Sequence, residues 1–305
     1  MIISEEPPPS DPESAVRLPE VVMERLRLRA NHLKMLPAVA AQALEIVKDP
    51  DCSIHEFSAV VERDAALAAD ILRLANSIQF SGSRTVLNLH QAVVRLGLRQ
   101  SKNLIMAASF SSMMKRLTLS EERIREWLWR HGFITALLAM NLNQSLDIGF
   151  QGEEFAGGLI HDIGRMLLVL CFPEDFGTID PMTPEEGPDT LNVESRLIGT
   201  NHCEVGAWFI QKNALPQLLY DTVRFHHTPE RSEHHRKFVA LISTCDHMAN
   251  YLQFAGSPRG YEPQRNSAVG VLEACGITGA TRRFQEIATE VMETADRNAA
   301  EMLGS

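Results

Sequence analysis

The stretch FAGGLIHDIGRMLLVL, residues 155–170, places the adjacent pair His161–Asp162 inside a segment that is otherwise almost wholly apolar. The spacing of its apolar residues predicts a buried helix over about residues 153–171. An imidazole and a carboxylate in an apolar interior are costly unless a partner satisfies them. The stretch therefore predicts a helical core with a polar site inside it.

Other polar, coordinating side chains are expected to point into the same interior. His131 lies on the apolar stripe of a helix predicted over about residues 121–142, and Asp246 lies on the inner side of a helix predicted near 237–253. His202 shares a helix face with apolar residues, and a second adjacent histidine pair ends the helix near 216–227. The resulting candidate metal ligands are His131, His161, Asp162, His202, His226, His227 and Asp246.

Imidazole and carboxylate ligands suit iron, manganese, nickel or zinc, and ligands from several helices of a bundle can build such a site. We expect one or two divalent ions, because a carboxylate such as Asp162 can bridge a pair. A pair of ions could generate hydroxide to attack a phosphoryl group. The alternative is that each histidine is a hydrogen-bonded core residue, which is the commoner situation for any one of them alone. A further pair, His234–His235, lies in RSEHHRK and is predicted to be exposed.

The rest of the chain also has helical periodicity, and no segment shows the alternation of a strand. Ser53 and Glu56 form a capping-box pattern, Asp64 is expected to cap the next helix, and Gly97 is expected to break a later one. The prolines and glycine of residues 172–200 predict a long loop there. The remaining predicted helices cover residues 38–48, 54–76, 88–110, 202–213, 216–227 and 281–302. The fold class is therefore predicted to be all-α.

The 305 residues carry a formal net charge of −10 and are 45% hydrophobic, which argues against a disordered chain and against general nucleic-acid binding. The charge is uneven, because residues 71–120 hold seven basic residues and no acidic one. This segment is a candidate surface for an anionic ligand or a partner. The alternative is a solvated helix face that acids from elsewhere neutralise. The residues of this candidate surface are Arg84, Arg95, Arg99 and Lys102.

No apolar run approaches the roughly 20 residues that cross a bilayer, so no membrane association is expected. The first residues, MIISEEPPPSDPES, lack the basic start and apolar core of a signal peptide. Five scattered cysteines with no CxxC pair argue against a disulfide framework or a thiolate zinc site. These features predict a cytoplasmic protein.

LWRHG (128–132) and FAGGLIHDIGRMLLVL resemble the HD superfamily of metal-dependent phosphohydrolases, which implies metal ligands at His131, His161, Asp162 and Asp246. Further segments resemble the HDOD domain, from about Leu18 to about Leu252. They are VVERDAALAADILRLANS (60–77), LNLHQAVVRLGLRQSKNL (87–104), NHCEVGAWFIQKNALP (201–216) and VRFHHTPE (223–230). This resemblance implies a helical bacterial signalling module that acts through a protein partner.

The expected organisation is a flexible acidic, Pro-rich N-terminus (1–17), an N-terminal helical lobe (18–118) and an HD-like helical lobe with a C-terminal helix (119–305). A sister group, the HD-GYP phosphodiesterases, hydrolyses cyclic di-GMP, and its additional ligands would fall on His202, His226 and His227. The chain departs from that group in two places: TPERSEHHRK replaces the Gly-Tyr-Pro loop, and Arg165 stands where the group has Lys.

The favoured hypothesis is a regulatory HDOD protein that retains a His/Asp metal site. The alternative is an active metal-dependent phosphohydrolase acting on a nucleotide or cyclic dinucleotide. A third, weaker hypothesis is that residues 71–120 bind a nucleotide second messenger or nucleic acid.

Overall fold

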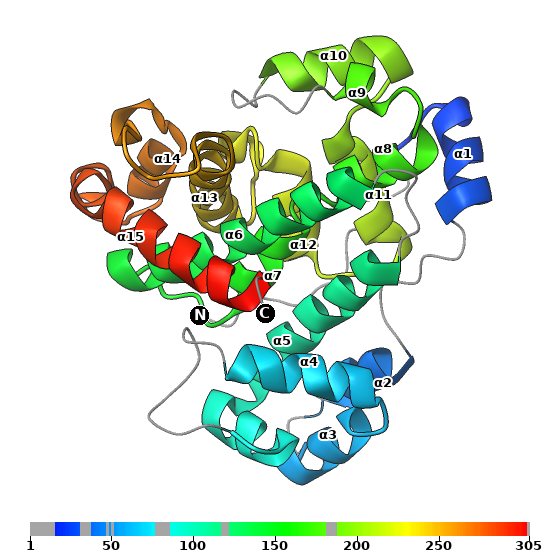
Figure 1. Ribbon diagram of the computed structural model, residues 1–305, viewed down its shortest axis with the longest axis vertical. Helices are drawn as coiled ribbons and strands as arrows, with labels where there is room; N and C mark the ends of the chain where they lie inside the picture. The colour runs from blue at the N-terminus through cyan, green and yellow to red at the C-terminus, as the bar shows by residue number, and fades with distance from the viewer. Residues whose placement is uncertain are drawn as a thin grey trace.

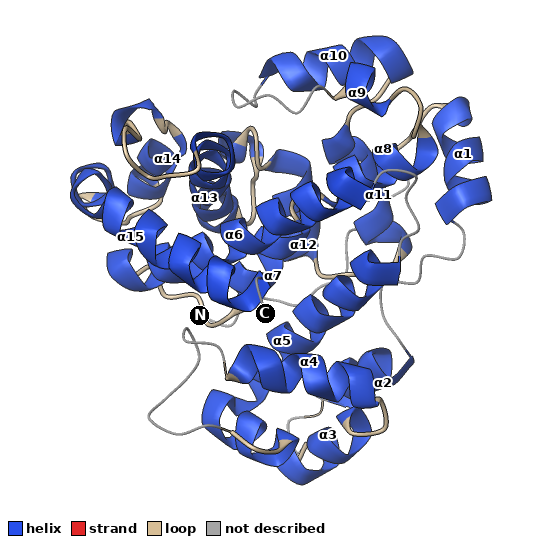
Figure 2. Cartoon of the chain, in the orientation of Figure 1, coloured by secondary structure: helices blue, strands red, loops and turns tan. Residues whose placement is uncertain are grey.

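The computed structural model describes residues 16–30, 38–46, 49, 52–76, 86–116, 122–180 and 188–303. Within these ranges every regular element is a helix and none is a strand, which confirms the all-α prediction (Figure 2). No helix of this described part is long and apolar enough to cross a membrane. The helices before residue 120 are α1 (Glu20–Ala30), α2 (Ala38–Ile46), α3 (Ile54–Val61), α4 (Ala65–Ala75) and α5 (Leu89–Arg116).

The helices α2, α3, α4 and α5 form a small lobe with its own apolar core (Figure 1). Its helix starts follow the sequence prediction. Ser53 Oγ accepts the backbone N–H of Glu56 at 3.1 Å, and Asp64 Oδ1 accepts that of Leu67 at 3.0 Å. Both contacts satisfy N–H groups that have no partner within the first turn of a helix.

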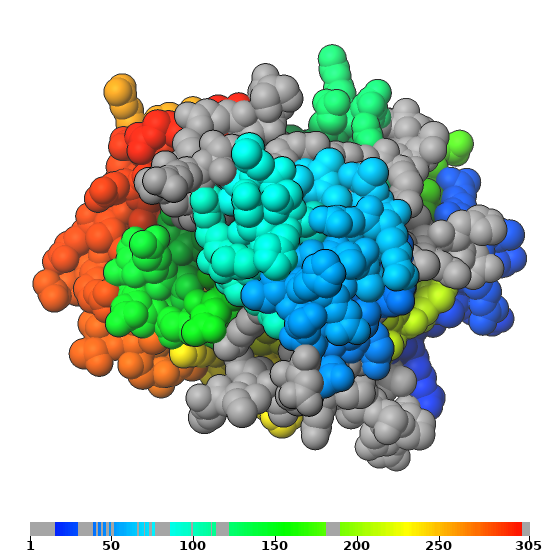
Figure 3. Space-filling model, turned by 90° about the horizontal axis from the view of Figure 1, so that it is seen from below, coloured from blue at the N-terminus to red at the C-terminus, as the bar shows by residue number. Residues whose placement is uncertain are grey.

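Helix α5 joins this lobe to the rest of the chain. Gly97 has φ 77° and ψ 162°, a left-handed conformation that kinks the helix where a break was predicted. Beyond the kink, Ile105 and Ala108 lie in the core of the small lobe, while Leu104 and Phe110 lie in the larger core. Seen from below, the small lobe lies in front of the larger one (Figure 3).

Helix α1 packs against α8 of the larger lobe (Figure 1). The guanidinium of Arg25 donates to Cys171 O at 3.0 Å and that of Arg29 donates to Leu170 O at 3.3 Å. These carbonyls belong to the last turn of α8. The carbonyl groups of a last turn have no hydrogen-bond partner within their own helix, and the helix dipole favours cations at this end. The sequence did not predict α1, because its apolar stripe is narrow.

The larger lobe surrounds the central helix α6. Its elements are α6 (Glu122–Leu146), α7 (Glu153–Ile160), α8 (Ile163–Cys171), α9 (Phe176–Ile179), α10 (Pro188–Ile198), α11 (His202–Lys212), α12 (Gln217–Phe225), η1 (Pro229–Arg231), α13 (Arg236–Ala255), η2 (Pro263–Arg265), α14 (Ala268–Ala274) and α15 (Ala280–Leu303). Helix α7 crosses α6 so closely that a Cβ on Gly158 would lie 2.6 Å from Ala136 Cα. The lack of a side chain at Gly158 therefore permits the close approach of the two helices.

Two predictions about this lobe were wrong. The helix expected over 153–171 is interrupted at His161–Asp162, where a turn separates α7 from α8. The long loop expected over 172–200 contains α9 and α10. Pro188 begins α10 rather than breaking it, since the first turn of a helix does not need the N–H that proline lacks.

Candidate metal centre

The structure brings all seven candidate ligands together around the turn between α7 and α8. His131 comes from α6, His202 from the first residue of α11, and Asp246 from α13. His226 and His227 directly follow α12. All except His227, which is half-buried, are buried, with at most 6% of the residue exposed. The cluster therefore lies inside the lobe, where water cannot fully solvate its charges.

Four residues form one half of the cluster, which we call subsite A: His131, His161, Asp162 and Asp246. Nε2 of His131 lies 3.2 Å from Nε2 of His161 and 3.0 Å from Oδ1 of Asp246. Oδ1 of Asp246 is also 3.5 Å from Nε2 of His161. One ligand atom from each of His131, His161 and Asp162 lies within 4.8 Å of the other two.

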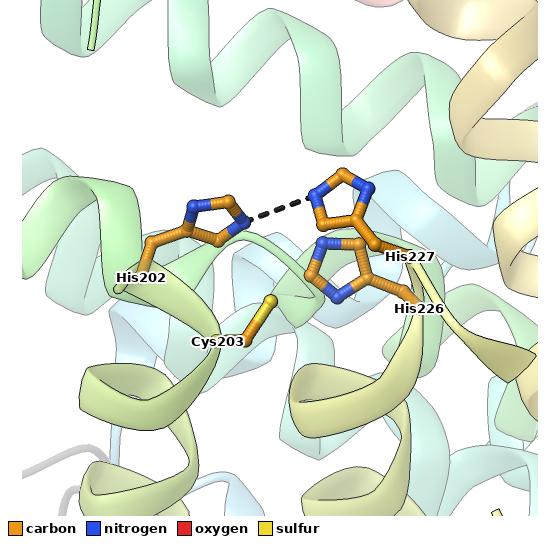
Figure 4. Close-up of side chains that lie close together, drawn as sticks. All are labelled: His202, Cys203, His226 and His227. Atoms are coloured by element: carbon orange, nitrogen blue, oxygen red, sulfur yellow. Dashed lines mark hydrogen bonds between the residues drawn. The ribbon is translucent and has the colours of Figure 1, made fainter. Parts of the chain in front are cut away.

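The other half, subsite B, comprises His202, Cys203, His226 and His227 (Figure 4). Their ligand atoms all lie within 4.8 Å of one another, and Nε2 of His202 is 3.1 Å from Nε2 of His227. Cys203 was not predicted as a ligand, because no cysteine of the chain lies in a CxxC pair. The signal that could have found it is its position directly after a candidate ligand at the start of a helix.

Asp162 lies between the two subsites and directs one oxygen to each. Its Oδ2 is 3.7 Å from Nε2 of both His131 and His161. Its Oδ1 is 3.4 Å from Nε2 of His226 and 3.7 Å from Nε2 of His202. Among the described residues, neither Asp162 Oδ1 nor His226 Nε2 has a hydrogen-bond partner. Two such buried atoms facing each other favour the binding of a cation between them.

Backbone carbonyls orient two of the histidines. Nδ1 of His161 lies 2.7 Å from Gly158 O, and Nδ1 of His226 lies 3.0 Å from Val223 O. A carbonyl only accepts, so each Nδ1 carries the hydrogen. In the neutral ring Nε2 is then a lone pair directed at the cluster. This is the arrangement in which metal-binding histidines are held.

Side chains orient two more of the histidines, His131 and His202. Gln253 donates from Nε2 to Trp127 O at 3.0 Å, which directs its Oε1 to Nδ1 of His131 at 2.9 Å. The carboxylate of Glu194, on α10, lies 2.9 Å from Nδ1 of His202. Both histidines thus also present Nε2 inward.

With Nδ1 carrying the hydrogen in each ring, the two Nε2 atoms face each other at 3.2 Å in subsite A, which is favourable only when a proton or a metal ion lies between them. Two nitrogens that each lie about 2.1 Å from one ion are separated by roughly 3.0 to 3.4 Å. The distances between Nε2 atoms in both subsites fall in this range. The residues therefore fit a divalent metal ion in each subsite.

The charged groups of the cluster shift one another's pKa values. Burial disfavours a cation at His161, but the charge of Asp162 and the hydrogen bond to Asp246 outweigh it and raise the pKa of His161 to about 9. Burial also disfavours ionised Asp162, but His161 and Arg165 hold its pKa well below the ordinary value. Burial lowers the pKa of His226 and His227, which keeps these rings neutral and able to bind a metal.

Arg165, which replaces the lysine of the sister group, is fully buried and committed to neighbouring carboxylates. Its Nε and Nη2 donate to Asp180 at 2.6 and 3.0 Å, and its Nη1 donates to Asp162 Oδ2 at 3.1 Å. Asp180, the residue directly after α9, was not predicted, because its segment was expected to be a loop.

The remaining sequence predictions concern the basic residues of 71–120 and the pair His234–His235. Arg84 is outside the described residues, and so is the side chain of Arg99. Arg95 is exposed on α5, and Lys102 is half-buried there. His234 is exposed as predicted, but the prediction was wrong for His235, whose Nδ1 lies 2.9 Å from buried Asp221.

Replacing Glu194 by Gln is expected to weaken metal binding at subsite B about 10- to 100-fold, because the neutral amide no longer raises the basicity of His202. The measurement is competitive titration with a chromophoric chelator. Glu204→Gln, the same change on a partly exposed residue of α11, is the control and should bind metal as the parent does. Equal affinities for the two variants would show that Glu194 does not support the site.

The metal-free protein is expected to lose stability as pH rises from about 6.5 to about 9. His161 has its pKa raised from 6.5 to about 9 on folding, so its contribution is full below the lower value and is lost through the upper one. The loss is on the order of 3 kcal/mol. His202 acts in the same direction: burial opposes its charge, but Cys203 and Glu194 raise its pKa well above the ordinary value.

Thermal unfolding of chelator-treated protein across this pH range measures the loss. Metal-loaded protein is the control, since a bound ion replaces the proton and should flatten the curve. A melting temperature of the metal-free protein that rises between pH 6.5 and 9 would contradict this prediction.

The fold and the cluster define an all-helical protein with a buried His/Asp site. The family model of the HDOD domain matches residues 33–229, and the chain therefore belongs to the HDOD domain family. An uncharacterised protein of Treponema pallidum (strain Nichols) is 25% identical over 228 residues, which are 73% of this chain and 44% of that protein. The chain thus spans less than half the length of this relative.

Two solved structures share the fold. An HDOD domain protein of unknown function from Geobacter sulfurreducens has a TM-score of 0.72 and 22% identity over 92% of this chain and 99% of its own. A protein from Shewanella amazonensis SB2B, proposed to be a phosphohydrolase, has a TM-score of 0.67 and 22% identity over 92% and 98% of the two chains. At these identities the likeness concerns the fold.

Proposed function

We propose that this chain is a regulatory signalling protein whose metal centre sets the position of surface helices that a protein partner recognises. The ligands are the seven residues of subsites A and B that the sequence indicated. The observation that carries the proposal is the inward direction of Nε2 in His131, His161, His202 and His226, each fixed by a partner at Nδ1. Such orientation is typical of a metal centre.

Two chains of contacts connect this centre to α9 and α10. Asp162 pairs with Arg165, which pairs with Asp180 directly after α9. His202 pairs with Glu194 of α10. Since both links begin at proposed ligands, the loss of metal is expected to loosen α9 and α10. Leu197 of α10 is 50% exposed, which gives this helix an apolar contact for a partner.

Burial favours regulation over catalysis. Of the seven ligands only His227 is partly exposed, and Arg165 is committed to two carboxylates rather than free to contact a substrate phosphate. The test is hydrogen exchange with and without metal. We expect faster exchange in residues 188–198 after metal removal and unchanged exchange in α3 and α4. Equal protection of α10 in both states would contradict the proposed output.

The alternative is a metal-dependent phosphohydrolase, which the position of Asp162 between the subsites favours. A metal pair bridged by a carboxylate supplies an activated water and neutralises phosphoryl oxygens. In this alternative the seven proposed ligands would hold the metal, Asp162 would contribute one oxygen to each subsite, and the partly exposed His227 would lie on the side open to a phosphate. Turnover of bis(p-nitrophenyl) phosphate or cyclic di-GMP by metal-loaded protein, abolished in Asp162→Ala, would establish this alternative over a purely regulatory role.

A further inference from the structure

Subsite B contains a sulfur atom among its imidazoles. Cys203 is the second residue of α11 and is 4% exposed. Its side chain points from the helix toward the space between the rings of His202 and His226 (Figure 4). Its Sγ is among the ligand atoms that all lie within 4.8 Å of one another.

A second observation points to a ligand at the same place. His226 has no exposed surface, and Nε2 lacks a hydrogen-bond partner among the described residues. Because its Nδ1 donates to Val223 O, this Nε2 is a lone pair in the neutral ring. The lone pair needs a hydrogen-bond donor or a cation, and the acceptor Asp162 Oδ1, 3.4 Å away, needs one as well.

We propose that Cys203 is a direct metal ligand, so that subsite B is a site with three imidazoles and one thiolate that prefers zinc. This inference rests on the proposed metal centre and adds the chemical identity of its second half. Imidazole nitrogens and a thiolate sulfur are ligands that Zn²⁺ favours, and Oδ1 of the shared Asp162 faces the same subsite. Subsite A, with two imidazoles and two carboxylates, has the harder ligand set that suits manganese or iron. The two halves thus select different ions.

Binding at subsite B involves a balanced exchange of a proton for the metal ion. The thiol of Cys203 loses its proton to solvent, its sulfur donates a lone pair to the divalent ion, and no electron is transferred. A thiol binds a divalent ion only as the thiolate, so the proton must leave as the metal binds. Metal affinity at subsite B should therefore increase with pH.

The test is a titration of Co²⁺ into the metal-stripped full chain, followed by absorbance. Thiolate ligation gives an intense sulfur-to-cobalt charge-transfer band in the near ultraviolet. We expect this band in the parent protein, its loss in Cys203→Ser, and its retention in Cys171→Ser. Cys171 is also fully buried but lies at the far end of α8, which makes it a matched control.

A second readout uses affinity. Cys203→Ser is expected to weaken Zn²⁺ binding by at least about tenfold, the lower limit for loss of a supporting group, and to leave Mn²⁺ binding unchanged. If cobalt binds without the band, or the band persists in Cys203→Ser, the thiolate ligand is refuted and the proposed metal centre stands. If the chain binds no cobalt, zinc or manganese, the metal centre itself is refuted.

Discussion

Asp162→Ala is expected to reduce the bound metal from up to two ions to well under one ion per chain. Its two oxygens face different subsites, so one substitution removes a ligand from both. A metal that binds only the native state stabilises the fold by about 4 kcal/mol when its free concentration is 1,000 times its dissociation constant. We expect Asp162→Ala to lose most of this stabilisation. Elemental analysis and thermal unfolding measure the two effects.

Asp221→Asn is the matched control, because Asp221 is also buried in this lobe but bonds to His235 and Ser232 outside the cluster. We expect this variant to be less stable but to retain its metal. Asp162→Ala with the metal content of the parent would contradict the assignment of Asp162 as the shared ligand.

Gly164→Ala is expected to prevent stable folding of the larger lobe. An added Cβ would lie 1.8 Å from His202 O and 3.0 Å from Gly206 N, both backbone atoms of α11. Neither can move without separating α8 from α11, and that contact holds His161–Asp162 beside His202. The expected loss exceeds the roughly 1–3 kcal/mol of ordinary overpacking. Urea unfolding followed by circular dichroism measures it.

Gly270→Ala is the control for this change. Gly270 lies inside α14, and an added Cβ would meet no atom within 4 Å. Because alanine favours helix by about 1 kcal/mol over glycine, this variant should be slightly more stable than the parent. Gly164→Ala with parental stability would show that α8 and α11 are not packed as described.

The sequence predicted the positions of the candidate ligands well, since facing inward is a local property of helical periodicity. His131 follows the stripe of α6, and Asp246 that of α13. The turn at His161–Asp162 was hidden, because Ile160 and Ile163 on either side of it are both buried and continue the apolar pattern. Local periodicity cannot distinguish a turn buried on all sides from one more turn of helix.

The residues that support the cluster could not be predicted from patterns within single segments of the sequence. Glu194 and Asp180 reach it only because α9 and α10 fold back over α8 and α11, a matter of tertiary packing. Cys203 becomes a candidate ligand only because α11 packs against α12, which places its sulfur near His226 and His227. No spacing rule within one helix contains that information.

We propose that the cluster holds two divalent metal ions, one on each side of Asp162. Anomalous X-ray scattering from crystals of metal-loaded protein tests it most directly. We predict two anomalous peaks, one bounded by His131, His161 and Asp246 and the other by His202, His226 and His227, with Asp162 between them. The absence of any peak within bonding distance of these side chains, in protein grown with excess metal, would contradict the claim.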